Sequence, residues 1–84
     1  MWFVYIVKCK DNSLYTGITT NIKRRIEQHN NKIGAKSLRS KIPVFLLHSE
    51  IFVNQIGAAK REREIKSWNR NKKLKLITHS LRSV

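Results

Sequence analysis

The chain has 84 residues, a length typical of one domain with a thin core, because such a domain buries only roughly 60 to 65% of its unfolded chain's surface. Lysine and arginine number 18 against 5 aspartate and glutamate residues, giving a formal net charge of +13, and the hydrophobic content of 40% argues against disorder. The charge indicates a polyanionic partner, and nucleic acid is the first candidate. The alternative interpretation is that the chain is a basic structural or ribosome-associated protein.

Cysteine usage and the N-terminal segment bear on location. Cys9 is the only cysteine, so no internal disulfide can form, and a buried strand thiol in a reducing cytoplasm is the expected setting. The apolar run from Trp2 to Val7 is too short for a signal peptide or a membrane span. These features predict a cytoplasmic protein.

The first 19 residues predict a β-hairpin. Residues 2–9 are rich in aromatic and β-branched side chains, residues 10–13 have turn chemistry, and residues 14–19 resume an extended pattern. They have no helical period, which excludes an all-helical fold.

A helix is predicted next, with Thr20 or Asn21 as its cap and an end at about Asn31. Isoleucines recur along it at helical spacing, at Ile22, Ile26 and Ile33. A loop rich in lysine, serine and glycine follows.

Residues 43–52 form an apolar run that predicts a third strand, at the centre of a sheet covered on both faces. Helical periodicity then extends over residues 55–68, and Asn69 can cap a last helix. That helix has an apolar side formed by Leu74, Ile77 and Leu81. The predicted class is α+β in the order ββαβαα, with a three-stranded, mainly antiparallel sheet flanked by helices.

Helical angles separate the basic residues of the first helix. At about 100° per residue from Ile22, Arg25 lies near 300° and His29 near 340°, both bordering the core-facing stripe. They are also one helical turn apart, close enough to act on one ligand. Arg24 points to solvent, where a general DNA contact or a solvated charge is expected.

The same argument separates two carboxylates of the second helix. Glu62 follows Ala58 by four residues and precedes Ile65 by three, so it lies on the inward arc, whereas Glu64 lies on the outer face. Glu62 is therefore the plausible metal ligand, although an ion pair with a neighbouring arginine explains its position equally well. Glu64 is expected to form a surface ion pair of little energetic value.

Two strand tyrosines, Tyr5 and Tyr15, can cooperate only if the hairpin register places them on one face. That requires Tyr5 to lie opposite Gly17 or Thr19, and the sequence leaves this register open. Gly17 supports a functional interpretation, because a strand glycine often marks the close approach of a ligand or another backbone. The alternative is that both tyrosines fill the core with the hydroxyl at a wet edge.

The remaining inventory excludes several kinds of site. The carboxylates show no pairing suited to two metal ions, so a single cation on one carboxylate is the remaining metal hypothesis. One cysteine and three scattered histidines supply no zinc ligand set, and His48 and His79 are expected to be ordinary polar side chains. No glycine-rich phosphate loop or Ser/His/Asp arrangement is present in the sequence.

An ordered set of short motifs resembles the GIY-YIG nuclease superfamily, and within it the small stand-alone members. The motifs are Val4-Tyr5-Ile6, Tyr15-Thr16-Gly17, Arg25 with His29, Gly34-Ala35-Lys36, Pro43-Val44, and Arg61-Glu62 ahead of Ile65-Lys66. The resemblance extends from about Phe3 to Ile77. Thr16 departs from the isoleucine of the founding motif, and Ser37-Leu38 replace a frequent Tyr-Thr.

The resemblance implies metal-dependent cleavage of DNA phosphodiester bonds with a single Mg²⁺ or Mn²⁺ ion. It assigns Tyr5 and Tyr15 as the motif tyrosines, Arg25 to the phosphate, His29 as the helix histidine, and Glu62 to the metal. Tyr5 or His29 would accept a proton from the attacking water, and Arg25 would meet the developing charge. These five residues form the predicted catalytic set.

Nucleic-acid contacts are predicted outside that set. The residues are Gly17, Arg24, Lys32, Lys36, Arg39 and Lys41. Larger relatives attach separate DNA-binding modules, so specificity here would come from the loop at residues 32–41, a partner protein or a homodimer. RNA stays possible as a substrate. The second function hypothesis is a non-catalytic nucleic-acid-binding module with the same fold.

Overall fold

The computed structural model describes the backbone of residues 1–82 and the side chains of residues 1–79. It has the order ββαβαα, with a single 3₁₀ turn between α1 and β3, which confirms the predicted α+β class. The elements are β1 (Trp2–Lys8), β2 (Leu14–Thr19), α1 (Ile22–Asn30), η1 (Lys36–Leu38), β3 (Phe45–Phe52), α2 (Gln55–Lys66) and α3 (Arg70–Arg82).

The three strands form one antiparallel sheet in the order β2-β1-β3. The β1–β2 turn is closed by the backbone N–H of Cys9, which donates to the Ser13 carbonyl at 2.8 Å. Asp11 accepts hydrogen bonds from the Ser13 backbone and hydroxyl, and Asn12 has a φ of 68°, a value that asparagine tolerates better than most residues. The predicted hairpin is confirmed.

The central strand is β1, so the prediction that the third strand lies at the centre of the sheet was wrong. Residues Val4 to Val7 are all at most 1% exposed, because helices and loops cover both faces of β1. β3 begins at Phe45, not at Pro43, and lies at an edge with Phe45 and Ile51 more than half exposed. The polar residues in the middle of β3 were the signal that this apolar run is only half covered.

α1 begins where the sequence predicts, since the side chain of Asn21 accepts a hydrogen bond from the Arg24 backbone N–H at 3.0 Å. It ends at Asn30, and Lys32 adopts a φ of 64°. Ile33 therefore lies beyond the helix and is 69% exposed, which corrects its assignment to the apolar stripe. The side-chain amide of Asn30 forms two hydrogen bonds to the backbone of Val44, and these hold the segment before β3 against the end of α1.

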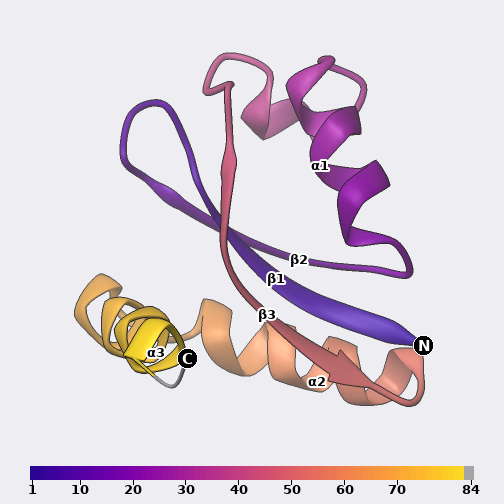
Figure 1. Ribbon diagram of the computed structural model, residues 1–84, viewed down its shortest axis with the longest axis vertical. Coiled ribbons are helices and arrows are strands. Elements are labelled where there is room, and N and C mark those ends of the chain that lie inside the picture. The colour runs from indigo at the N-terminus through magenta and orange to yellow at the C-terminus, as the bar shows by residue number, and fades with distance from the viewer. Residues whose placement is uncertain (83–84) are drawn as a thin grey trace.

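Helices lie on both faces of the sheet (Figure 1). Each face has its own buried cluster. On one face, Val4 and Ile6 pack against Ala58 and Ile65 of α2 and Ile77 of α3. On the other face, Tyr5, Val7 and Cys9 pack with Leu38 and Val44, near α1 and the loop that follows it. In Figure 1, α1 lies above the sheet and α2 below it. Alternation along β1 thus divides the molecule into two chemically different halves.

Asparagine caps begin both C-terminal helices. The side chain of Asn54 accepts from the Gly57 N–H at 3.0 Å, and that of Asn69 accepts from the Lys72 N–H at 2.9 Å. Leu74 and Ile77 pack toward the core as predicted, whereas the side chain of Leu81 lies outside the described residues. Across residues 1–82 no helix combines the length and the apolar character that spanning a membrane requires.

Candidate active site

The hairpin register brings the two tyrosines to the same face. Tyr5 lies opposite Gly17, so Tyr15, two residues away on β2, points to the same side of the sheet. The two ring centroids are 6.4 Å apart. The condition that the sequence left open is therefore met, and the two phenols can act on one ligand.

His29 completes a compact group with these tyrosines. Its Nε2 lies 2.9 Å from the hydroxyl oxygen of Tyr5, and its ring centroid lies 5.6 Å from that of Tyr15 in an edge-on arrangement. Both His29 and Tyr5 are 1% exposed. The predicted inward position of His29 on α1 is confirmed, and the hydrogen bond between two titratable groups provides a path for a proton.

Two glycines make room for this pair. A β-carbon on Gly17 would lie 2.5 Å from the Tyr5 hydroxyl oxygen, and one on Gly34 would lie 2.2 Å from Nδ1 of His29. The expected close approach at Gly17 exists, but the approaching group is the phenol of Tyr5. Gly17 is itself buried, so its contribution to the site is to accommodate Tyr5.

Arg25 lies half-buried at the border of the same group, as its helical angle predicts. Its Nη1 donates to Oε1 of Gln28 at 3.2 Å, which holds the guanidinium along α1. Arg24 is exposed, in agreement with its predicted position on the solvent side. Of the two adjacent arginines, only Arg25 is therefore close to the tyrosine cluster, which consists of Tyr5, Tyr15 and His29.

Burial and charge keep the Tyr5–His29 pair neutral near pH 7. Burial raises the pKa of Tyr5, hydrogen bonding from Arg25 opposes that rise, and the neighbouring Tyr15 and Glu62 add to it, with a net increase. Burial lowers the pKa of His29, and the positive charge of Arg25 lowers it further. The pair therefore holds one phenolic proton and one neutral imidazole.

Glu62 lies on the inward arc of α2, as predicted. Its side chain is 22% exposed, and its carboxylate pairs with Lys66 at 3.3 Å, not with an arginine. The described residues contain no group of three or more His, Cys, Asp and Glu side chains placed to hold a metal ion. A single hard oxygen donor still fits Mg²⁺, which typically binds one or two carboxylates together with waters and substrate phosphates.

The loop after α1 presents most of its predicted cations to solvent. Lys32, Lys36 and Arg39 are exposed, while Lys41 is half-buried and lies 3.8 Å from the carboxylate of Asp11. Leu38 is 3% exposed and belongs to the core, so position 38 cannot contact a substrate. The loop therefore offers a basic surface beside the tyrosine cluster.

Sequence reasoning missed a polar network on the opposite face of the sheet. Arg61 donates to both carboxylate oxygens of Glu50, at 2.8 and 3.1 Å, and Nε2 of His48 lies 2.8 Å from the same carboxylate. Arg61 also pairs with Glu64 and lies over the ring of Trp68. The i,i+2 spacing of His48 and Glu50 on β3 was the available signal, because it places both on one face of a strand.

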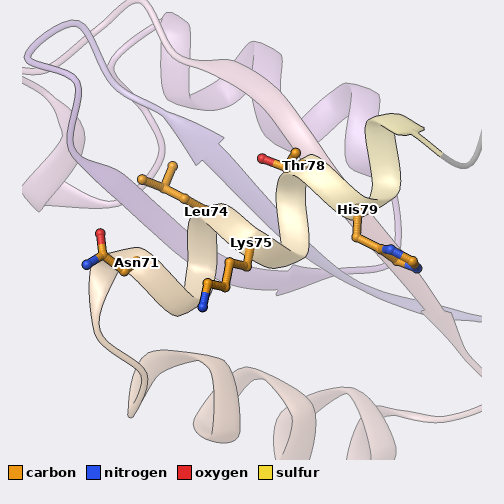
Figure 2. Close-up of a pocket in the computed structure, with 5 residues that line it drawn as sticks. All are labelled: Asn71, Leu74, Lys75, Thr78 and His79. Atoms are coloured by element: carbon orange, nitrogen blue, oxygen red, sulfur yellow. The ribbon is translucent and has the colours of Figure 1, made fainter.

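The surface pocket on α3 lies apart from these groups. Its lining comes from Asn71, Leu74, Lys75, Thr78 and His79, all on one helix (Figure 2). α3 packs on the face opposite Tyr5, so this pocket does not contribute to the tyrosine cluster. His79 is exposed there, in keeping with its predicted role as an ordinary polar residue.

The chain matches the family model described as the GIY-YIG catalytic domain over residues 1–75. It is 53% identical over 75 residues to a UPF0213 protein of Staphylococcus haemolyticus, covering 89% of this chain and 92% of that one. It is also 53% identical over 78 residues to a UPF0213 protein of Clostridium perfringens, covering 93% and 84% of the two chains. The names of these relatives state no activity.

Two solution NMR structures share the fold. A UPF0213 protein of Bacillus halodurans aligns with a TM-score of 0.60 and 40% identity, covering 93% of this chain and 84% of that one. A protein of E. faecalis aligns with a TM-score of 0.61 and 35% identity, covering 94% and 85%. The chain therefore belongs to the GIY-YIG family, a nuclease-type family, as a relative of its small UPF0213 proteins.

Proposed function

We propose that this protein is a metal-dependent endonuclease that hydrolyses phosphodiester bonds of DNA. The observation that most supports the proposal is the hydrogen bond of 2.9 Å between Tyr5 and His29, formed in a buried site with Arg25 at its border. Binding of nucleic acid alone requires no such pair, because phosphates are recognised by exposed cations. The family and the net charge of +13 support the same substrate class.

In the proposed reaction, a water oxygen forms a bond to phosphorus while the bond from phosphorus to the leaving sugar oxygen breaks. The water proton passes to the Tyr5–His29 pair, and the leaving oxygen takes up a proton from solvent. Arg25 stabilises the negative charge that develops on the phosphoryl oxygens, and Tyr15 orients the water or the phosphate. Each of these roles uses a group of the described cluster.

Glu62 would hold the metal ion, which we propose to be Mg²⁺ or Mn²⁺. When bound, such an ion polarises the scissile phosphate and neutralises part of its charge. Glu62 is half-buried, and its negative charge contributes to the raised pKa of Tyr5, which supports its assignment to the same site. Its ion pair with Lys66 would open when the cation binds.

Substrate contacts outside the site would come from Arg24 and from the exposed cations of the loop, Lys32, Lys36 and Arg39. Such contacts bind the phosphate backbone and do not select a base sequence. One active site cuts one strand, so the proposed product is a nick. Selection of a target would then require a DNA structure, a partner protein or a second copy of the chain.

The test is nicking of supercoiled plasmid and of branched DNA with Mg²⁺, Mn²⁺ or EDTA. Wild type should nick with either cation and stop with EDTA, and Glu62→Gln, which keeps the side-chain size, should reduce the rate to background. Glu64→Gln is the matched control, because Glu64 lies two residues away and is exposed. Equal DNA binding by all three proteins without any cleavage would favour the non-catalytic binding module.

A further inference from the structure

The solvent side of α3 presents only side chains that can donate hydrogen bonds. Five exposed residues fall within an arc of about 120° on this helix, at about 100° per residue. Ile77, on the opposite side of the helix, is 4% exposed and packs in the core. The five residues, called the α3 face below, are Asn71, Lys72, Lys75, Thr78 and His79.

The positive charge of α3 is not balanced by carboxylates of the fold. The chain has 5 Asp and Glu residues, and none follows Glu64. Arg61 pairs with Glu50 and Glu64, and Lys66 pairs with Glu62, so the carboxylates nearest in sequence already have partners. No ion pair among the described residues involves a cation of the first half of α3, namely Arg70, Lys72, Lys73 or Lys75. A surface with such an excess of positive charge attracts a polyanion.

The pocket on α3 gives this surface the chemistry of a phosphate-backbone contact. Its polar lining comes from the α3 face, and Figure 2 shows the side chains of Lys75 and His79 pointing to the same side of the helix. Lysine, asparagine and threonine side chains are common partners of phosphate and sugar oxygens. The rise from Asn71 to His79 is about 12 Å. Since each strand of duplex DNA has one phosphate per about 3.4 Å of helix axis, the α3 face can follow roughly three or four phosphates.

The α3 face and the tyrosine cluster lie on opposite sides of the sheet. Ile77 of α3 packs with Val4 and Ile6, whereas Tyr5 and Val7 belong to the cluster on the other face. The sheet and its covering helices lie between the two surfaces in a molecule of 28 × 27 × 26 Å (Figure 1). A straight segment of nucleic acid that passes the tyrosine cluster therefore does not reach α3, and a polyanion bound there is a second segment.

We propose that the α3 face is a second nucleic-acid interface, which binds the phosphate backbone of a separate segment and lets one copy of the protein bridge two segments. Its contacts are to phosphates, so this binding is independent of base sequence. Only the consequence for cleavage rests on the proposed function. Where two segments lie close together, as at a crossing in supercoiled DNA, the segment held on α3 raises the local concentration of the other at the tyrosine cluster.

The test of binding mixes two short duplexes, one with a donor dye and one with an acceptor dye, with wild-type protein. We expect energy transfer and, in sedimentation, a complex of one protein with two duplexes. Lys72→Gln/Lys75→Gln should lose the energy transfer, and the salt slope for the second duplex should fall by about 1.8, because two phosphate contacts are lost. Lys60→Gln/Arg63→Gln is the matched control, since it removes the same two charges from exposed positions of α2, and it should bridge as wild type does.

Equal bridging by the two double variants would mean that net charge alone joins the duplexes, and would overturn the proposal. Wild-type protein that binds only one duplex at saturation would also overturn it. Lys72 lies 4.6 Å from the ring centroid of Trp68, so its removal also affects packing. If the α3 double variant does not fold, Lys75→Gln alone decides, with an expected fall in slope of about 0.9.

Cleavage assays separate this proposal from the proposed function. Lys72→Gln/Lys75→Gln should nick a short linear duplex at the wild-type rate and supercoiled plasmid about tenfold more slowly, because only the plasmid offers a second segment nearby. Bridging by wild type without any cleavage would contradict the nuclease and leave the α3 interface standing. Cleavage without bridging would contradict the α3 interface and leave the nuclease standing.

Discussion

The two faces of the sheet use polar residues in opposite ways. On the face covered by α2 and α3, the carboxylate of Glu50 is hydrogen-bonded to Arg61 and His48. The charges of Glu50 and Arg61 therefore neutralise each other. On the face near α1, Tyr5 and His29 form a pair that contains no carboxylate, and burial keeps both neutral. Charges that satisfy one another stabilise the fold, whereas a neutral, titratable pair retains a proton that can be moved.

The pKa of Glu50 illustrates the difference. Burial would raise it, but the hydrogen bonds from Arg61 and His48 outweigh burial and hold the pKa below its usual value. At Tyr5 burial prevails over the single opposing cation, Arg25. The first environment fixes an ionised state at neutral pH, and the second leaves a proton that can be moved.

The largest expected effect is on the α1 side. Arg25→Ala should slow nicking by on the order of 10² to 10³, because it removes one donor that meets charge in the transition state. Stability should change little, since Arg25 is only half-buried. Single-turnover cleavage rates measure the effect.

Arg24→Ala is the matched control, because Arg24 is the adjacent residue on the exposed side of α1. It should leave the single-turnover rate within a few-fold of wild type and weaken DNA binding slightly. Equal loss of rate in both variants would mean that general phosphate binding, and not a defined site, explains the effect of Arg25.

On the opposite face the expected effect is on stability. Arg61→Met leaves Glu50 without its bidentate partner and removes a cation that lies 5.1 Å from the Trp68 ring centroid. The expected loss is about 2 kcal/mol of unfolding free energy, typical of hydrogen bonds to a charged group, measured by urea denaturation. The cleavage rate per folded molecule should not change.

Arg63→Met controls for the removal of a positive charge from α2, because Arg63 is exposed. It should alter the unfolding free energy by about 0.5 kcal/mol or less. If Arg61→Met instead abolished cleavage while the protein stayed folded, the separation of the two faces into a stabilising and a reactive one would be wrong.

A smaller effect concerns pH. Since the pKa of His29 is lowered in the folded protein, the unfolded chain binds more protons just below the ordinary value of 6.5. Stability should therefore fall as the pH drops from 6.5 toward the folded pKa, and His29 should add no further change below that. Unfolding free energies of wild type and His29→Phe between about pH 8 and pH 5 should diverge only in this window.

The comparison with His29→Phe is needed because other groups titrate too. The lowered pKa of Glu50 contributes stability that is present above its ordinary value of 4.5 and is lost as the pH falls through the folded pKa. That loss occurs in both proteins. Parallel pH curves for wild type and His29→Phe would show that His29 is not buried in its neutral form.

Local signals were sufficient to predict most of the fold. The turn at Asp11, the asparagine caps at positions 21 and 69, and the helical periods depend on neighbours in sequence. The position of β3 depends on what covers it, which an apolar run does not specify, so the sequence predicts a central strand where the structure has an edge strand. The prediction that Ile33 belongs to the apolar stripe of α1 was wrong for a similar reason. Its spacing fits the helix, but the helix ends at Asn30.

The site was predictable where it depends on angles along one element. Arg25, His29 and Glu62 lie where the helical spacing placed them. The register that unites Tyr5 with Tyr15, and the contact of Gly34 with His29, are long-range facts that no local pattern contains. The same holds for Arg61, whose partner Glu50 lies on another element.

The smallest expected effect tests whether the loop beside the tyrosine cluster is a nucleic-acid surface. Lys36 is exposed there, so Lys36→Gln should lower the slope of log binding constant against log salt by about 0.9, because one DNA phosphate is no longer neutralised by the protein. Lys60→Gln removes the same charge from the exposed side of α2, on the other half of the molecule. If DNA lies along the face of the reactive pair, only the first variant changes the slope. Equal changes would mean that DNA samples the whole basic surface, and that the difference between the two faces governs catalysis but not binding.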